Sequence, residues 1–393
     1  MSGGKSAVIV GAGIGGLTAA LSLARDGWQV QVFEQAHRLE PVGSGLQISP
    51  NASRVLADLG VLPRLDGLAV EPEAMVVRSG RNGSTLTSMP LGETAEKRWG
   101  APFLVVHRGD LQNALLAAAT EQSSIALHLG RRLEALKFRD RSVTATLSRY
   151  TDELTVETDL LIGADGLWSK VRGQVGLTGP ASFSGCVAWR TLIPADSVPA
   201  FAREMRSNLW LGSGAHVVHY PLRGGSVINV VAVVEENWRE RGWSEPGDIA
   251  WINRRFEDWH SDLTALIGSA DTWLRWSLFD RAPEWRWSRS PAVLLGDAAH
   301  PMLPFLAQGA AQAIEDAAVL SRSLRGHASI SDALKGYEEE RLRRAARIQR
   351  LSHRQASIYH LANPAAIVRD AAMALLGHDV LARRYGWIYD HRA

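Results

Sequence analysis

The chain has 393 residues, 46% of them hydrophobic and 21% charged, with a formal net charge of +2 at pH 7. This length exceeds one ordinary hydrophobic core and predicts a globular protein of two or three domains. The balanced charge argues against a nucleic-acid partner. The single cysteine, Cys186, excludes an internal disulfide and is typical of a reducing, cytoplasmic compartment. No apolar stretch approaches the length of a membrane span, so we expect no membrane contact.

The N-terminal segment is predicted to form a strand, a helix and a second strand. Ser6–Val10 and Gln29–Glu34 are short apolar runs, and residues 15–26 between them have a helical pattern that ends at Gly27. This order is that of a βαβ unit, which carries parallel strands.

Glycines at the start of this helix indicate a nucleotide site. The stretch VIVGAGIGGLTAA places Gly11, Gly13 and Gly16 between the first strand and the helix. The first allows a tight turn, the second lets a pyrophosphate reach the backbone, and the third allows close helix packing. Glu34 ends the second strand, where its carboxylate can accept hydrogen bonds from a ribose diol. We therefore expect an adenine dinucleotide, and the acid disfavours NADP at this site.

The following elements are predicted from the period of their apolar residues. Strand-like alternation covers residues 104–106, 133–150, 154–162 and 183–234, the last predicting an antiparallel sheet. Helical patterns cover residues 107–120, 246–281 and 331–361. Residues 74–98 lose helical periodicity and are predicted to be an insertion. In the long C-terminal helix, six arginines from Arg341 to Arg354 are predicted to form a solvated face.

Two further turns follow buried strands. In DLLIGADGLWSKVR, Asp165-Gly166 ends a strand and Arg172 comes seven residues after the acid. In VLLGDAAHPMLPFLAQGAAQAIEDAAVL, a strand ends at Gly296-Asp297 and a loop with two prolines leads to a helix that begins around residue 308. Elements of the nucleotide fold thus recur along the chain and predict a discontinuous domain.

These three motifs, in this order, resemble the class A flavoprotein monooxygenases, the single-component aromatic hydroxylases typified by para-hydroxybenzoate hydroxylase. The resemblance covers nearly the whole chain. It implies an α/β fold, with a Rossmann-like FAD-binding domain, an inserted mixed or antiparallel-sheet substrate domain and a C-terminal helical segment. The expected ranges are 1–73, 99–176 and 285–325 for the FAD-binding domain, 74–98 and 177–284 for the substrate domain, and 326–393 for the helical region.

The cofactor implied by the resemblance is FAD. Asp297 would accept hydrogen bonds from its hydroxyls, Asp165 would brace the pyrophosphate region, and Arg108 would contact the phosphates. The free amides at the helix start would stabilise negative charge on reduced flavin by about 0.3–1 kcal/mol. Packing under a sheet explains small residues there equally well, but it does not explain Asp297. The expected cofactor-binding residues are Gly11, Gly13, Gly16, Glu34, Arg108, Asp165, Gly166, Asp297, Gln308, Gly309 and Ala310.

The segment GAHVVHYPLRGG carries the expected catalytic residues. On a strand, His216 and Tyr220 share one face and His219 lies on the other. The spacing resembles relatives that hydroxylate 3-hydroxybenzoate and 6-hydroxynicotinate, which implies His216 as general base and Tyr220 as a substrate contact, the two together forming a proton relay. A purely structural histidine is the alternative.

Four further residues are expected to contact substrate. Gln47 could instead be an ordinary strand-end polar group. Arg190 could receive a carboxylate or pair within the sheet. Pro304 and Phe305 stand where relatives carry a polar residue, which predicts a more apolar floor. His300, after the cofactor aspartate, is expected to support the loop.

The expected reaction is hydroxylation of a small phenolic acid, of the 3-hydroxybenzoate or salicylate type, through a flavin C4a-hydroperoxide formed from O₂. NADH or NADPH would dock transiently, because no second glycine fingerprint is present. A hydroxypyridine acid such as 6-hydroxynicotinate is an alternative substrate. A flavin oxidoreductase without oxygen insertion and a nucleotide-sensing protein are alternative functions. No metal site is expected, and the C-terminal helix could serve a homodimer or brace the FAD-binding domain.

Overall fold

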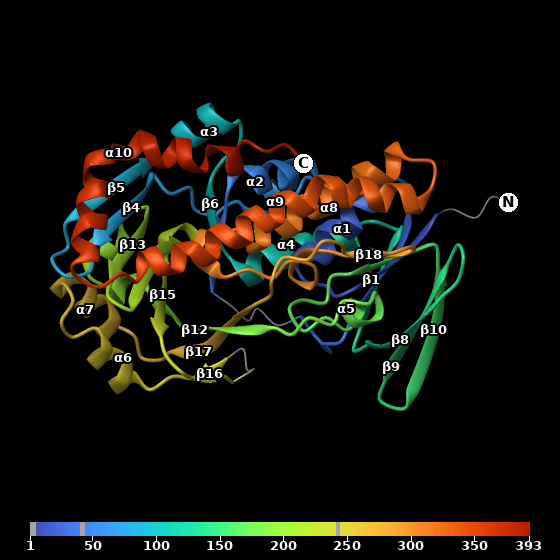
Figure 1. Ribbon diagram of the computed structural model, residues 1–393, viewed down its shortest axis with the longest axis horizontal. Helices are drawn as coiled ribbons and strands as arrows, with labels where there is room; N and C mark the ends of the chain where they lie inside the picture. Colours follow the sequence, from blue (N-terminus) through green and yellow to red (C-terminus); the bar gives the residue numbers. More distant parts are fainter. Residues whose placement is uncertain (1–4, 40–43, 241–243) are drawn as a thin grey trace.

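The computed structural model describes residues 5–39, 44–240 and 244–393. Two large sheets lie toward opposite ends of its long axis, and the C-terminal helices run along both (Figure 1). The predicted α/β class is confirmed.

A six-stranded sheet forms the nucleotide half of the molecule, in the order β18-β19-β11-β1-β2-β7. Its strands other than β18 are parallel. The central strands β1, β11 and β19 are buried apolar runs, as expected of a sheet covered on both faces, whereas β7 at the edge is partly exposed. Their bounds are β1 Ser6–Val10, β2 Gln29–Glu34, β7 Ile125–Leu129, β11 Leu160–Gly163, β18 Ser288–Arg289 and β19 Ala292–Leu294. Both strands predicted at the N-terminus are therefore confirmed.

Helix α1 (Ile14–Arg25) packs between α4 (Arg108–Thr120) and α8 (Gly309–Gly326). The contact with α8 is close because Gly15 has no side chain: a Cβ there would lie 2.7 Å from Leu295 Cδ2 and 3.0 Å from Ala313 Cβ. Small residues at this crossing bring the helix starts near one another.

An eight-stranded sheet forms the other half, in the order β16-β17-β12-β15-β14-β13-β4-β5. It is antiparallel except for the pair β13 and β4. Its strands are β4 Ala74–Ser79, β5 Thr85–Pro90, β12 Ser182–Pro194, β13 Arg206–Gly212, β14 Ala215–Leu222, β15 Val227–Glu235, β16 Glu245–Pro246 and β17 Leu274–Asp280. One face packs on the short helices α6 (Ile249–Arg255) and α7 (Ser261–Gly268) around buried tryptophans.

The helical prediction for residues 246–281 is wrong at its C-terminal end. Residues 274–280 form β17, which pairs with β12. Trp276 and Leu278 alternate onto one buried face, so the period of two decides this segment once the neighbouring strand is present.

Smaller elements connect the two halves. A three-stranded sheet projects at one end of the molecule, and β3 pairs with β6 between the halves (Figure 1). The strands are β3 Gly45–Ile48, β6 Leu104–His107, β8 Arg132–Phe138, β9 Val143–Arg149 and β10 Asp152–Thr158. The helices are α2 Pro50–Asp58, α3 Glu93–Trp99 and α5 Lys170–Gln174.

The C-terminal region consists of α9 (Ile330–Tyr359) and α10 (Ala365–Tyr389). Helix α9 packs on α8 and confirms the predicted long C-terminal helix. Four of its six arginines, Arg343, Arg347, Arg350 and Arg354, are exposed as predicted, but Arg341 and Arg344 are not. Arg341 is 0% exposed and pairs with Glu315 and Asp316 of α8. Arg344 also bonds Glu315, so two arginines brace the nucleotide half. Within the described residues, no helix is both long enough and apolar enough to cross a membrane.

Candidate active site

The three predicted motifs converge at one edge of the parallel sheet. Strands β1, β2, β11 and β19 run in the same direction, so their carboxyl ends meet, which is where open α/β sheets bind ligands. Backbone hydrogen bonds join the turns: Gly11 N donates to Phe33 O (2.7 Å), and Leu295 N donates to Gly163 O (3.0 Å). The predicted convergence is confirmed.

The three glycines have different surroundings. A Cβ on Gly11 would overlap the carbonyl of Ala164, and one on Gly16 would overlap the carbonyl of Gly11. Gly11 also has a φ of +107°, which side chains disfavour. A Cβ on Gly13, however, would meet no atom within 4 Å. Gly11 and Gly16 therefore permit the turn, while Gly13 leaves open space beside the helix start.

Glu34 holds the second strand against this turn. Its carboxylate accepts hydrogen bonds from Ala12 N and Ala36 N, both at 2.9 Å. The side chain thus lies at the glycine loop, where the sequence places a ribose-binding acid. Its contact with a ribose remains a prediction.

Asp165 caps the helix that follows the second motif. Its Oδ2 accepts from Lys170 N (2.7 Å) and Val171 N (3.1 Å), while its buried Oδ1 has no described partner. Burial raises the pKa of Asp165. Arg172, itself buried, donates to the carbonyls of Ala298 and Ala299 at 3.1 and 3.2 Å and so ties the second motif to the third.

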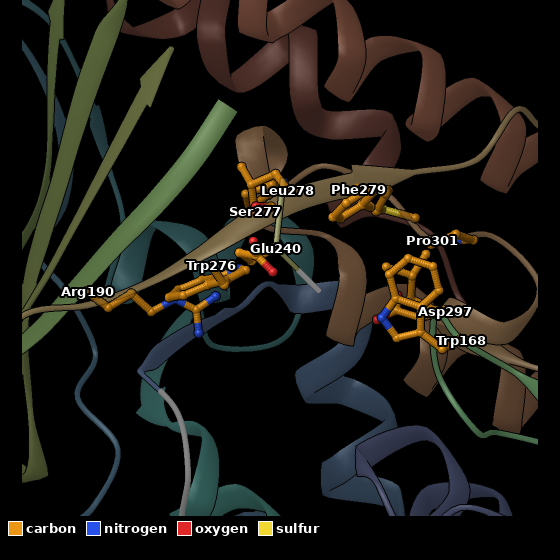
Figure 2. A pocket seen from close by; sticks show the side chains of 12 residues that line it. Trp168, Arg190, Glu240, Trp276, Ser277, Leu278, Phe279, Asp297 and Pro301 are labelled. Carbon is orange, nitrogen blue, oxygen red and sulfur yellow. The ribbon is translucent and has the colours of Figure 1, made fainter. Parts of the chain in front are cut away.

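The third motif opens into a cavity that reaches the large sheet. Asp297 is accessible to solvent, but it lies in a recess of the protein. The loss of hydration there raises its pKa, and the nearby positive charges of His300 and Arg108 partly offset this rise. Figure 2 shows Asp297 and Pro301 on one side and Arg190 over Trp276 on the other. The remaining residues that line this cavity are Leu167, Trp168, Glu240, Ser277, Leu278, Phe279, Met302 and Pro304.

Arg190 presents a cation to this cavity. Its guanidinium carbon lies 3.0 Å from the ring centroid of Trp276, and its buried Nε has no described hydrogen-bond partner. Burial, together with the nearby charge of Arg108, lowers the pKa of Arg190 to about 9. The alternative that Arg190 pairs within the sheet is not what the structure shows. Arg190 is half-buried, so its guanidinium offers the cavity a charged donor whose Nε lacks an acceptor, and such a donor can bind an anion.

His216 lies on the same sheet face as Trp276. The two belong to one row across the sheet, through the paired residues Ala188 and Val233. The His216 ring packs 5.2 Å from the Phe305 ring, next to the cavity residue Pro304. It therefore lies behind the apolar floor, outside the residues that line the described cavity.

His219 and Tyr220 are separated from His216. His219 points to the opposite face, against Phe201 and Trp210, as predicted. Tyr220 shares the face of His216, but four residues along a strand span about 13 Å. The two side chains therefore do not lie next to each other, and the expected relay between His216 and Tyr220 stays a prediction.

Tyr220 instead packs against the strand that carries Gln47. A Cβ on Gly45 would collide with the Tyr220 ring, so glycine is required there. Gln47 Nε2 donates to Ser207 Oγ at 3.3 Å. Both residues border the face that carries Arg190, without lining the described cavity.

The start of α8 lies beside Asp297. Gln308 is buried, with Nε2 donating to Ser49 Oγ (2.8 Å) and Oε1 accepting from Asn51 Nδ2 (3.2 Å). Its side chain therefore faces the protein, and any cofactor contact at this point comes from the backbone. A Cβ on Gly309 would meet only Asp297 Oδ1, at 3.9 Å, so Gly309 and the following Ala310 leave space at the helix start.

Helix α9 positions the cavity loop. Gln349 Nε2 donates to Pro301 O (2.9 Å), and Ser352 Oγ donates to Leu303 O (2.5 Å). His300, beneath the loop, contacts Asp316 Oδ2 at 2.5 Å, which agrees with its expected supporting role. The cavity roles of Trp276 and α9 were not predicted, because the sequence gives no local signal for contacts across the fold.

Comparisons with known proteins agree with this geometry. Residues 5–352 match the family model described as FAD binding domain, which defines a flavoprotein. The chain is 38% identical over 387 residues to 3-amino-4-hydroxybenzoate 2-monooxygenase of Streptomyces cremeus, covering 98% of this chain and 95% of the relative. It is 36% identical over 385 residues to 3-hydroxybenzoate 6-hydroxylase 1 of Aquipseudomonas alcaligenes, covering 97% and 96%.

The fold comparison gives the same result. HpxO of Klebsiella pneumoniae, solved with FAD and uric acid, superposes with a TM-score of 0.85 at 26% identity, covering 96% of this chain and 95% of that structure. The chain therefore belongs to the class A FAD-dependent aromatic hydroxylases, and its cofactor is FAD.

Proposed function

We propose that the protein hydroxylates a small aromatic carboxylic acid that carries a phenolic hydroxyl, with NADH or NADPH as reductant. The observation that carries this proposal is Arg190, an unpaired cation stacked on Trp276 in the cavity that reaches Asp297. Bound FAD would supply the redox chemistry, accepting a hydride from the reductant and activating O₂ so that one oxygen atom enters the ring.

The residues that would hold FAD are those at the sheet edge. Open space beside Gly13 admits the pyrophosphate, the unpartnered Oδ1 of Asp165 awaits a donor, and Asp297 can accept from cofactor hydroxyls. Glu34 would bind the adenosine ribose, and Arg108 would contact phosphate. The amides at the start of α8 would face the flavin.

The cavity extends from Arg190 to Asp297 and has a volume of about 140 Å³. Because FAD held by Asp297 would take part of this space, only a small substrate with one ring would fit beside it. Arg190 would bind the carboxylate, while Trp276 and Pro304 contact the ring. Tyr220 and Gln47 would contact the substrate at the border of the site.

His216 would accept the phenolic proton. Burial, and the neighbouring His360, lower the pKa of His216 well below its usual value, so the imidazole is neutral and able to accept a proton at neutral pH. The substrate hydroxyl would have to reach the Phe305 side of the cavity. Removing the proton makes the ring more nucleophilic toward an electrophilic oxygen.

Both named relatives act on benzoates with a ring hydroxyl, which matches the pairing of Arg190 with His216. We therefore place 3-hydroxybenzoate and 3-amino-4-hydroxybenzoate first, with salicylate and 6-hydroxynicotinate as rivals. The test is a screen of these four acids with the FAD-loaded protein, following NADH and NADPH oxidation and identifying products by mass. A product heavier by one oxygen is expected for at least one acid.

Other outcomes of the screen are decisive. Faster NADH oxidation that yields only H₂O₂ for every acid would contradict hydroxylation and favour an oxidoreductase without oxygen insertion. A colourless protein that does not bind FAD would contradict the whole assignment.

The domain ranges expected from the sequence, a cytoplasmic location and a homodimer also remain proposals. Sedimentation of the FAD-loaded protein tests whether it is a homodimer.

A further inference from the structure

We propose that His360 and Glu235 form a proton path that connects His216 to solvent. His216 Nδ1 lies 2.9 Å from His360 Nε2, and His360 Nδ1 lies 3.1 Å from Glu235 Oε1. Both imidazoles are buried, whereas the Glu235 side chain is 59% exposed. The chain of contacts therefore runs from behind the cavity floor to the surface. This inference rests on the proposed role of His216 as general base.

Three separate elements hold the path in place. His216 is on β14, Glu235 ends β15, and His360 follows the last residue of α9. Gly214 joins them through its backbone: its N–H donates to His360 O (3.1 Å), and its carbonyl accepts from Glu235 N (2.9 Å). The alignment is thus fixed by backbone hydrogen bonds as well as by the side chains.

The contacts allow one proton to pass without leaving a charge on either imidazole. When His216 Nε2 takes the substrate proton, Nδ1–H can donate its own proton to His360 Nε2. His360 Nδ1–H then releases a proton to the Glu235 carboxylate, which exchanges with water. Each imidazole gains a proton on one nitrogen and loses one from the other, so both end neutral.

The groups around the path keep the histidines neutral at rest. Burial lowers the pKa of His360; Glu235 opposes this, and Arg255 of α6 and Arg369 of α10 add to the lowering. The Tyr359 ring lies 5.2 Å from His216, and burial raises the pKa of this phenol well above its usual value. Burial, and to a smaller extent the charge of Glu235, raise the pKa of the nearby Cys186 thiol to about 11. The two histidines therefore pass a proton on more readily than they hold it as a charged imidazolium.

The test uses the FAD-loaded protein with 3-hydroxybenzoate and with 3-amino-4-hydroxybenzoate. It measures the rate of phenolate formation on binding, by ultraviolet absorbance, and the pH profile of product formation. The variants are His360→Gln, His360→Ala with and without imidazole, and Glu235→Gln. The control is His353→Gln, on the same helix, with a side chain that is 68% exposed and bonded to Asp280.

We expect His360→Gln to slow both phenolate formation and product formation by about tenfold or more, because glutamine can bond His216 but cannot pass a proton. Imidazole should restore much of the rate in His360→Ala. Glu235→Gln, at an exposed position that leaves folding intact, should lower the rate roughly two- to fivefold and move the pH profile. His353→Gln should match the wild type.

Wild-type rates and an unchanged pH profile in both His360→Gln and Glu235→Gln would overturn the path, as would an equal loss in His353→Gln. A loss in His360→Ala that imidazole leaves unchanged would also contradict it. A wild-type protein that makes no product from any of the four acids of the screen contradicts the proposed function instead, so the two failures are distinguishable.

Discussion

At the scale of single residues, Arg190 carries the strongest functional signal. A guanidinium with a buried nitrogen that lacks an acceptor is costly unless an anion completes it. Stacking on Trp276 orients the charge but supplies no hydrogen-bond acceptor. An anionic ligand would therefore complete the hydrogen bonding of Arg190, as the proposed function requires.

Replacing Arg190 with methionine should weaken binding of 3-hydroxybenzoate by about 10- to 150-fold, the equivalent of about 1.5–3 kcal/mol for a hydrogen bond to a charged group. Binding of 3-hydroxybenzamide should change much less, because the amide is neutral. Dissociation constants from flavin fluorescence give the comparison. Arg275→Met is the control, since Arg275 lies on β17 beside Trp276 in sequence but stacks on Trp238 at 4.2 Å. Equal losses for acid and amide would rule out a carboxylate role.

At the scale of elements, the turn from β1 to α1 contains one glycine that is needed for packing and another that is free to contact a ligand. Gly16 is packed against the carbonyl of Gly11, whereas Gly13 faces open space. Gly13 also has a φ of −73°, which alanine adopts without strain. The two glycines should therefore respond differently to the same substitution.

Gly16→Ala should destabilise the FAD-free protein by about 1–3 kcal/mol through overpacking. Gly13→Ala should leave its melting temperature unchanged but weaken FAD binding by about tenfold or more, because the methyl group displaces phosphate from backbone donors. Thermal unfolding of the FAD-free protein and FAD titration measure the two effects. If Gly13→Ala bound FAD as the wild type does, the pyrophosphate would not approach at this point.

At the scale of the whole molecule, a buried charge network joins the C-terminal helices to the nucleotide half. Arg341 lies between Glu315 and Asp316, all three being 0% exposed. Burial would raise the pKa of both acids, but Arg341, with Arg344 for Glu315 and His300 for Asp316, outweighs it and holds each pKa at about 2. This network lies under the cavity loop and α8 start.

Arg341→Met should destabilise the protein by about 3–5 kcal/mol, since it removes the cation that two buried carboxylates share and leaves Glu315 with Arg344 and Asp316 with His300. Arg343→Met, two positions along at an exposed site, should have almost no effect. Midpoints of denaturant unfolding at pH 7 measure the difference. Similar midpoints for the two variants would show that Arg341, like Arg343, contributes little to stability.

The same network predicts how stability depends on pH. Because the folded pKa of each acid is below its ordinary value near 4, the network stabilises the protein fully above about pH 5 and less as the pH falls toward 2. Each carboxylate contributes on the order of 2 kcal/mol to this loss. Unfolding midpoints of the wild type at pH 7, 5 and 3 should fall more steeply than those of Arg341→Met. Parallel curves would contradict the assignment.

The sequence alone determined the parts of this protein that depend on local pattern. The βαβ opening, the glycine turn and the acid at each later strand end are signalled within a few residues, because turns and short strands have local requirements. Parallel pairing then places the carboxyl ends together, so the convergence at Gly11, Asp165 and Asp297 followed from the order of the motifs.

Only the tertiary structure decided which distant side chains meet. Residues 274–280 became a strand through pairing with β12, and Arg341 became a core residue through the acids of α8. His216 contacts His360 and not Tyr220. His360 lies 144 residues after His216 in the sequence, and the two rings are in contact because the end of α9 returns to β14. Such contacts depend on how elements pack, and packing is a property of the assembled chain that no local period of residues encodes.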